Sequence, residues 1–159
     1  MIRQEDSTEN WLKSLHGQEF RSVEALVYVY GDVENIEHPQ AVSLKFSLSE
    51  SNIIECDSDG DSIKVSRGNI VESDLEEFGR EVIKDFSTHE IWSKFIGKRV
   101  SSSFLIESVG QVKAGIGFEF EDGNSIYILN LGDELFIFNK FDELDDLLRS
   151  EPSIVVRMI

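Results

Sequence analysis

Short runs in which apolar and polar residues alternate are the feature that most limits what this chain can fold into. Residues 41–49 place Val42, Leu44, Phe46 and Leu48 at every second position. This spacing predicts a β-strand with one buried face, because successive side chains of a strand point to opposite sides. Alternation of this kind, or a content of β-branched and aromatic residues, predicts further strands at 22–32, 52–56, 62–66, 99–108, 112–122, 125–130 and 134–139.

The two ends of the chain carry different signals. Near the N-terminus, Trp11, Leu12 and Leu15 fall on one face of a short helix. Residues 139–150 have leucines at helical spacing among acidic residues, which predicts an amphipathic helix. After a proline, residues 153–159 are rich in β-branched residues and predict a closing edge strand.

The middle of the chain is predicted to contain two more helices. The first covers 73–86, where Ser73 and Glu76 form a capping box. Leu75, Phe78, Val82 and Phe86 follow at the spacing of one helical face. The second covers 87–97 and opens on another capping box.

The order of these elements indicates an α+β fold. Strands occur in runs and are not each followed by a helix, which favours mostly antiparallel sheets over a parallel, doubly wound one. The chain has 159 residues, of which 40% are apolar, enough to build a core, and no Gly/Ser/Pro-rich linker divides it. We therefore expect a single domain over 1–159.

An internal repeat is indicated when the sequence is shifted by 72 residues. Residues 44–65 then align without a gap with 116–137, and apolar positions and turn residues coincide. We predict a duplicated unit, a three-strand meander followed by an acidic helix, over about 23–86 and 98–149. A chance match between two meanders is the alternative.

Asp57, Asp59 and Asp61 alternate in a predicted turn and raise the question of a metal site. A calcium loop of the EF-hand type, counted from Asp57, needs glycine at its sixth and glutamate at its twelfth position. Ser62 and Gly68 stand there instead, and no helices flank the loop. We therefore expect an exposed acidic hairpin, with no metal and no other cofactor.

Residue patterns typical of catalysis are missing from the sequence. The three histidines form no metal-ligand set, and no phosphate-binding glycine loop or nucleophile elbow is present. Cys56 lies between Glu55 and Asp57, whose charges would raise the thiol pKa, so it is expected to pack as a small apolar residue. We expect a protein without enzymatic activity. An enzyme that uses a pair of carboxylates is an alternative, although no pair stands out.

The charge balance indicates what kind of partner the chain can bind. Its 31 acidic and 15 basic residues give a formal charge of −16, which repels nucleic acid and anionic membranes and attracts a basic protein. Acidity that serves only solubility is the alternative. If a partner is bound, the candidate contact residues are the acids of three clusters: Asp57, Asp59, Asp61; Glu72, Asp74, Glu76, Glu77; and Asp142, Glu143, Asp145, Asp146.

A cytoplasmic location is expected. One cysteine excludes an internal disulfide, no signal-peptide core is present at the start, and no apolar run has the roughly 20 residues of a membrane span.

The segment DGNSIYILNLGDELFIFNKFDELDDLL, residues 122–148, in a short acidic chain rich in meanders, resembles the small cytosolic immunity proteins of bacterial contact-dependent inhibition and polymorphic toxin systems. The resemblance implies a non-enzymatic protein that binds one cognate toxin domain, often a basic nuclease, and occludes its active site. It transfers no individual residue, since these proteins share no fixed motif. A structural or adaptor domain, or a homodimer through the edge strand at 153–159, is the alternative.

Overall fold

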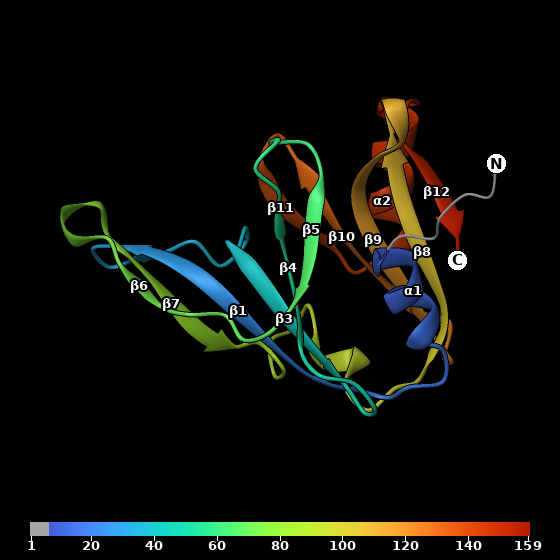
Figure 1. The fold of residues 1–159 in the computed structure, drawn as a ribbon, viewed down its shortest axis with the longest axis horizontal. Coiled ribbons are helices and arrows are strands. Elements are labelled where there is room, and N and C mark those ends of the chain that lie inside the picture. The colour runs from blue at the N-terminus through green and yellow to red at the C-terminus, as the bar shows by residue number, and fades with distance from the viewer. Residues whose placement is uncertain (1–6) are drawn as a thin grey trace.

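The computed structural model describes residues 7–159 and consists of two antiparallel β-sheets and two α-helices (Figure 1). The strands of the first sheet are β1 (Phe20–Tyr30), β2 (Val33–Glu34), β3 (Ala41–Phe46), β4 (Asn52–Cys56), β5 (Ile63–Arg67), β6 (Ser73–Asp74) and β7 (Arg80–Asp85). They are arranged in the order β5-β4-β3-β1-β7-β6, with β2 paired to β1.

The second sheet follows the first in the chain. Its strands are β8 (Val100–Ser108), β9 (Val112–Phe120), β10 (Ser125–Leu131), β11 (Glu134–Phe138) and β12 (Val155–Met158), in the order β11-β10-β9-β8-β12. The helices are α1 (Ser7–Ser14) and α2 (Phe141–Ser150), and three 3-10 turns are η1 (Glu76–Phe78), η2 (Ser93–Phe95) and η3 (Val109–Gln111). The predicted class, mostly antiparallel sheets with few helices, is confirmed.

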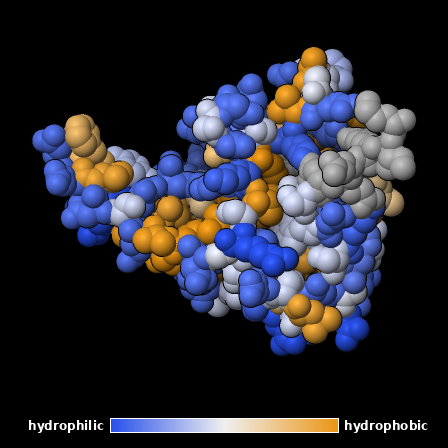
Figure 2. Space-filling view, in the orientation of Figure 1, coloured by the Kyte–Doolittle hydropathy of each residue, from blue (hydrophilic) through white to orange (hydrophobic). Residues whose placement is uncertain are grey.

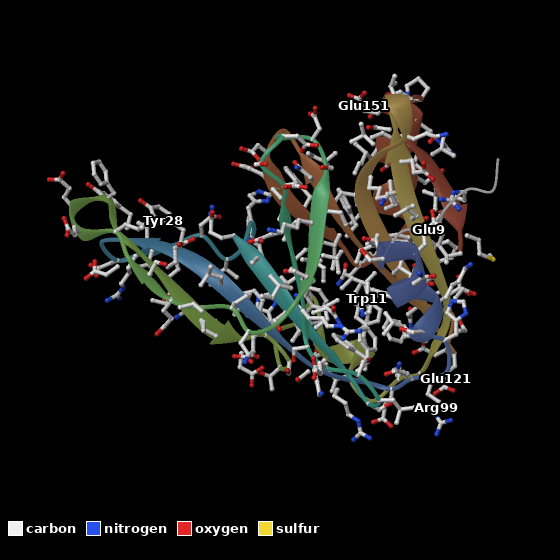
Figure 3. All side chains as sticks on the ribbon, viewed as in Figure 1. Glu9, Trp11, Tyr28, Arg99, Glu121 and Glu151 are labelled. Atoms are coloured by element: carbon white, nitrogen blue, oxygen red, sulfur yellow. The ribbon has the colours of Figure 1, made fainter. Side chains whose placement is uncertain are left out.

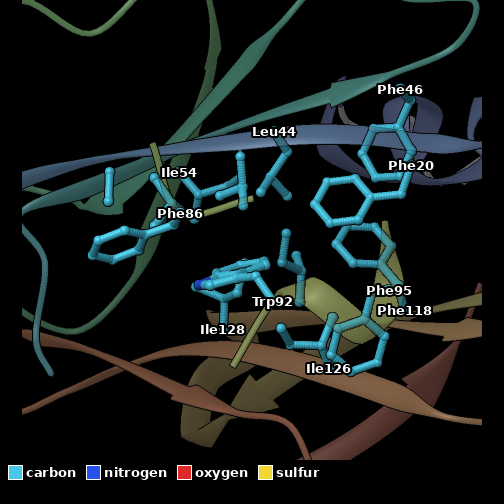
Figure 4. Close-up of a cluster of buried hydrophobic side chains, with 14 of the residues drawn as sticks. Phe20, Leu44, Phe46, Ile54, Phe86, Trp92, Phe95, Phe118, Ile126 and Ile128 are labelled. Atoms are coloured by element: carbon cyan, nitrogen blue, oxygen red, sulfur yellow. The ribbon is translucent and has the colours of Figure 1, made fainter. Parts of the chain in front are cut away.

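One hydrophobic core joins the two sheets (Figure 4). Phe46 of β3 and Phe118 of β9 meet with ring centroids 5.6 Å apart, and Trp11 of α1 lies over Phe118 at 6.0 Å. Helix α1 therefore packs at the junction of the two sheets. A short helix with an apolar face was predicted in this segment, whereas its place in the fold was not.

A second, smaller core lies on the other face of the second sheet. Leu144 of α2 is fully buried against Ile106, Tyr127 and Leu129. Helix α2 thus covers that sheet with its apolar side and leaves its acidic side exposed, as predicted from 139–150. The layers are first sheet, second sheet and α2.

The two helices predicted in the middle of the chain are not formed, so both predictions are wrong. Residues 73–86 form β6, η1 and β7, and 87–97 form turns around η2. Strand β7 pairs with β1 along its whole length, so a helix here would leave the backbone groups on that side of β1 without partners. Gly79 has φ +102°, which no α-helix accommodates. Val82 and Phe86 fit the helical spacing, but they fit an alternating strand equally well.

The repeat is not confirmed in the predicted form. The shift by 72 residues would place Leu44 opposite Cys56, as Ile116 stands opposite Ile128. Leu44 instead pairs with Asn52, so the β3–β4 hairpin has a different register from the β9–β10 hairpin. No α-helix follows the first meander among the described residues. What the two sheets share is topology. In the second sheet β8 to β11 are neighbours in chain order, and in the first sheet so are β1, β3, β4 and β5, with the two-residue strand β2 outside this path. In each sheet a later strand, β7 or β12, pairs with the first of the four.

Candidate protein-binding surface

One end of the first sheet extends beyond the rest of the molecule (Figure 1). This arm, defined here as residues 28–37 and 71–81, contains the end of β1, strands β2 and β6, turn η1 and the start of β7. Ten large apolar side chains of the described residues are exposed, and five of them lie in the arm: Tyr30, Val33, Val71, Leu75 and Phe78. Figure 2 shows hydrophobic side chains at its outer end, bordered by hydrophilic ones. Exposed apolar groups gathered in this way mark interaction sites more often than scattered ones do.

The arm is also strongly acidic. It carries one basic residue, Arg80, and a formal charge of −7 from eight acids: Asp32, Glu34, Glu37, Glu72, Asp74, Glu76, Glu77 and Glu81. Acids surrounding exposed apolar side chains form a surface that complements a basic protein and repels nucleic acid.

Local hydrogen bonds hold the outer end of the arm in a defined shape. The Asp74 carboxylate accepts from the backbone N–H of Glu76 at 2.9 Å, and the backbone N–H of Leu75 donates to Gly79 at 2.9 Å. A Cβ at Gly79 would lie 2.5 Å from the carbonyl oxygen of Val29, so only glycine lets η1 approach β1 this closely. The exposed side chains are therefore carried on an ordered turn.

A hollow lies on the arm between β1, β2 and the segment that follows β2. This tyrosine hollow has a volume of about 620 Å³ and is lined by Tyr28, Tyr30, Val33, Glu34, Asn35, Ile36 and Glu37. Figure 3 marks the position of Tyr28. The Tyr28 hydroxyl donates to the Phe78 carbonyl, and the backbone N–H of Asn35 donates to the Tyr28 carbonyl at 2.9 Å. These bonds tie the hollow to both halves of the arm.

The acids predicted from the sequence as contact residues lie on three separate surfaces. The cluster from Glu72 to Glu77 is in the arm, the cluster from Asp57 to Asp61 is in the β4–β5 turn, and the cluster from Asp142 to Asp146 is on α2. Figure 1 shows the arm and α2 at opposite sides of the molecule. One compact partner surface therefore cannot contact all eleven acids.

Some of these acids have structural roles. Asp59 accepts hydrogen bonds from the Ser62 hydroxyl and from two backbone N–H groups, and these bonds, the hydroxyl's first, lower its pKa. Glu72 accepts from the backbone N–H of Ile83 at 2.9 Å, and Asp57 from that of Ser58 at 2.8 Å. Within the described residues, one of the eleven acids forms an ion pair, Asp145 with Arg149 at 3.0 Å. Most carboxylates of the three clusters are thus available to an external cation.

Residues 28–37, the first of the two segments of the arm, were not among the predicted contact residues. Asp32 is the last residue of the strand predicted at 22–32, and Glu34 and Glu37 follow it outside every predicted strand and helix. The signal available was the pair Tyr28 and Tyr30, two aromatic residues at alternate positions just before a Gly-Asp turn.

Cys56 lies in an acidic cleft of about 380 Å³ at the base of the arm, between the end of β4, residues 35–40 and the β10–β11 turn. Burial, followed by the charges of Asp133, Glu134 and Glu55, raises the pKa of its thiol to about 11. The raised pKa and the contribution of Glu55 are as predicted. Asp57 was also predicted to contribute but does not, and the contributions of Asp133 and Glu134 from the second sheet were not predicted.

We expect Cys56 to react slowly with iodoacetamide near pH 8, because only the thiolate attacks and a pKa of about 11 keeps the thiol protonated. The uncharged reagent avoids repulsion by the acidic cleft, and mass spectrometry measures the rate. The urea-unfolded protein is the reference and should react faster. Replacing Asp133 by Asn and Glu134 by Gln should raise the rate less than unfolding does, since burial is the larger cause. Equal rates for folded and unfolded protein would contradict the assignment.

Neither metal-ligand clusters nor membrane spans are found in residues 7–159. No group of three or more His, Cys, Asp or Glu side chains there is placed to hold a metal ion. No helix in that range is long and apolar enough to cross a membrane.

Comparison with known proteins links the chain to one group of sequences. A family model described as "Family of unknown function (DUF6334)" matches residues 4–140. No curated protein and no solved structure matches the chain.

Proposed function

Because the chain belongs to the DUF6334 family, whose function is unknown, its role has to come from its own surface, and we propose that it is an immunity protein. In this proposal it has no enzymatic activity, binds a cognate basic toxin domain, and neutralises the toxin by covering its active site. The proposal includes a cytoplasmic location, which the use of a single cysteine favours.

The arm is the observation that carries the proposal. Its eight acids and one base surround five exposed apolar side chains on a projecting, ordered end of the first sheet. Protein interfaces combine a few desolvated apolar anchors with a polar rim. The arm has both components, and the sign of its rim suits a basic partner.

The proposed mechanism has an electrostatic and an apolar step. The formal charge of −16 attracts a cationic domain over a distance and raises the association rate. On contact, carboxylates of the arm occupy the places where a nuclease would hold substrate phosphates, and Arg and Lys side chains of the toxin pair with them. Apolar anchors such as Phe78, which is 68% exposed, then slow dissociation by burial.

The test is a titration with the C-terminal domain of the protein encoded immediately upstream. We expect one-to-one binding by calorimetry, loss of that domain's toxicity, and an association rate that falls on the order of 10- to 1000-fold from low to high salt. Stopped-flow fluorescence measures the rate.

Two matched variants assign the contact surface. Glu76→Gln with Glu77→Gln neutralises two carboxylates of the arm, and Asp142→Asn with Asp146→Asn neutralises two on α2. The proposal expects the first pair to slow association more than the second. An association rate that does not depend on salt concentration would contradict the electrostatic step but not inhibition. No binding at either salt concentration would contradict the immunity role.

A homodimer or adaptor domain is the second candidate, favoured by β12. This strand pairs with β8 at the edge of the second sheet, and Val155 and Met158 on it are 59% and 67% exposed. Residues 152–159 contain no acid, so the repulsion between two acidic copies is weakest there. A mass that doubles with concentration in sedimentation equilibrium, without any basic partner, would favour this candidate.

A further inference from the structure

We propose that the tyrosine hollow is a socket for one arginine side chain of a basic protein partner, an inference that rests on the proposed function for the charge of that partner. It specifies which side chain the arm recognises and where. The proposal concerns residues that none of the predicted acidic clusters contains.

The first support is the aromatic wall of the hollow. Tyr28 and Tyr30 are alternate residues of β1 and share a face of the strand, and Val33 stands directly opposite Tyr30 in the β1–β2 pairing. Tyr30 is 60% exposed and Val33 72% exposed. A guanidinium group stacks on tyrosine rings, and the three methylene groups of arginine can cover the valine.

The second support is the pair of carboxylates that line the same hollow. Glu34 is held by Lys84 of β7, with Nζ and Oε1 2.6 Å apart. Glu37 is exposed and forms no ion pair within the described residues. A planar guanidinium can stack on an aromatic ring and donate in its plane to a carboxylate at the same time, whereas an ammonium group cannot.

The third support is that the hollow already has its shape before any partner binds. The hydroxyl of Tyr28 is bonded to the Phe78 carbonyl, and the segment after β2 is bonded to β1 through Asn35. Residues that are ordered before binding lose less conformational entropy when the partner arrives. Anions are excluded by the net charge of the arm, and a purely apolar side chain would leave Glu37 unpaired.

The experiment uses the full chain and does not depend on the upstream domain. The isotope-labelled protein is titrated at low ionic strength with a short capped Ser-Gly peptide that carries two arginines, followed by NMR. Matched peptides carry lysine or the uncharged analogue citrulline at the same positions. We expect saturable shifts of the amides of residues 28–37 with the arginine peptide, about two- to fivefold weaker binding of the lysine peptide, and no binding of the citrulline peptide.

Three surface variants make the assignment specific. Tyr30→Leu keeps an apolar side chain without a ring face, and Glu37→Gln removes the charge at constant shape. Each substitution should lower the affinity for the arginine peptide about two- to fivefold. Glu121→Gln removes an exposed carboxylate outside the arm and outside the predicted acidic clusters, and it should leave the affinity within about twofold. Spectra of the unliganded variants show that each is folded.

The outcomes separate this inference from the proposed function. Shifts spread equally over α2 and the β4–β5 turn, or affinities unchanged in Tyr30→Leu and Glu37→Gln, would overturn the socket. If the upstream domain also binds these two variants as tightly as it binds the parent chain, the socket is refuted while the immunity role stands. Peptide binding at the hollow without any binding of the upstream domain would support the socket and contradict the immunity role.

Discussion

Replacing Phe46 with alanine is expected to lower the free energy of unfolding by about 3–5 kcal/mol. Phe46 is 1% exposed, and its ring centroid lies 5.2 Å from that of Phe20 on β1 and 5.6 Å from that of Phe118 on β9. It also contacts Trp11 of α1 at 6.5 Å. The substitution therefore leaves a cavity where both sheets and α1 meet. Domains are stable by only about 5–15 kcal/mol, so this loss removes a large part of the total.

Urea denaturation followed by tryptophan fluorescence measures the effect. Phe78→Ala is the matched control, because the same ring is 68% exposed at the end of the arm. It should change the free energy of unfolding by less than about 0.5 kcal/mol. Similar losses for the two variants would mean that the arm contributes to the core and that Phe78 is not available to a partner.

Replacing Gly117 with alanine is expected to destabilise the protein by about 1–3 kcal/mol, although alanine is favoured over glycine in a strand by backbone entropy. Gly117 of β9 stands opposite Tyr127 of β10, and a Cβ would lie 2.3 Å from the Tyr127 ring. Tyr127 is 3% exposed and packs against Phe104 with centroids 6.2 Å apart. Because this ring is buried, we expect overpacking to outweigh the entropic gain.

Thermal unfolding should show a decrease of roughly 2–12 °C in Tm for Gly117→Ala. A double-mutant cycle with Tyr127→Ala identifies the cause. The double variant should be more stable than the sum of the single effects by about 0.5–3 kcal/mol, because the ring that the new methyl group meets is gone. Additive effects would show that the methyl group is accommodated in another way.

The candidate surface could be predicted from the sequence only in part. The acids from Glu72 to Glu77 were predicted as candidate contact residues, and they are exposed, but on a turn and a strand pair instead of a helix. Composition alone indicates that acids stay at the surface, whatever element carries them. The tyrosine hollow is lined by residues 28–37 alone, and the two tyrosines at alternate positions were its only signal in the sequence. Its shape was not predictable, because the Tyr28 hydroxyl is fixed by the Phe78 carbonyl, 50 residues away in the chain.

The sequence by itself determined those strands and helices whose apolar residues fit either the two-residue period of a strand or the 3.6-residue period of a helix, but not both. Alternation in 41–49 and the leucine spacing in 139–150 each fit one element, and β3 and α2 form there. Strand β3 ends at Phe46, however, and Leu48, predicted on its buried face, lies in the following turn and is 85% exposed. Only the tertiary structure decided the element at 73–86, where Val82 and Phe86 fit both periods. The pairing of β7 with β1 satisfies backbone N–H and C=O groups that a helix would leave unpaired, and it outweighs the local capping signal at Ser73. The same pairing builds the arm, so the candidate binding surface follows from a long-range contact that no local pattern contains.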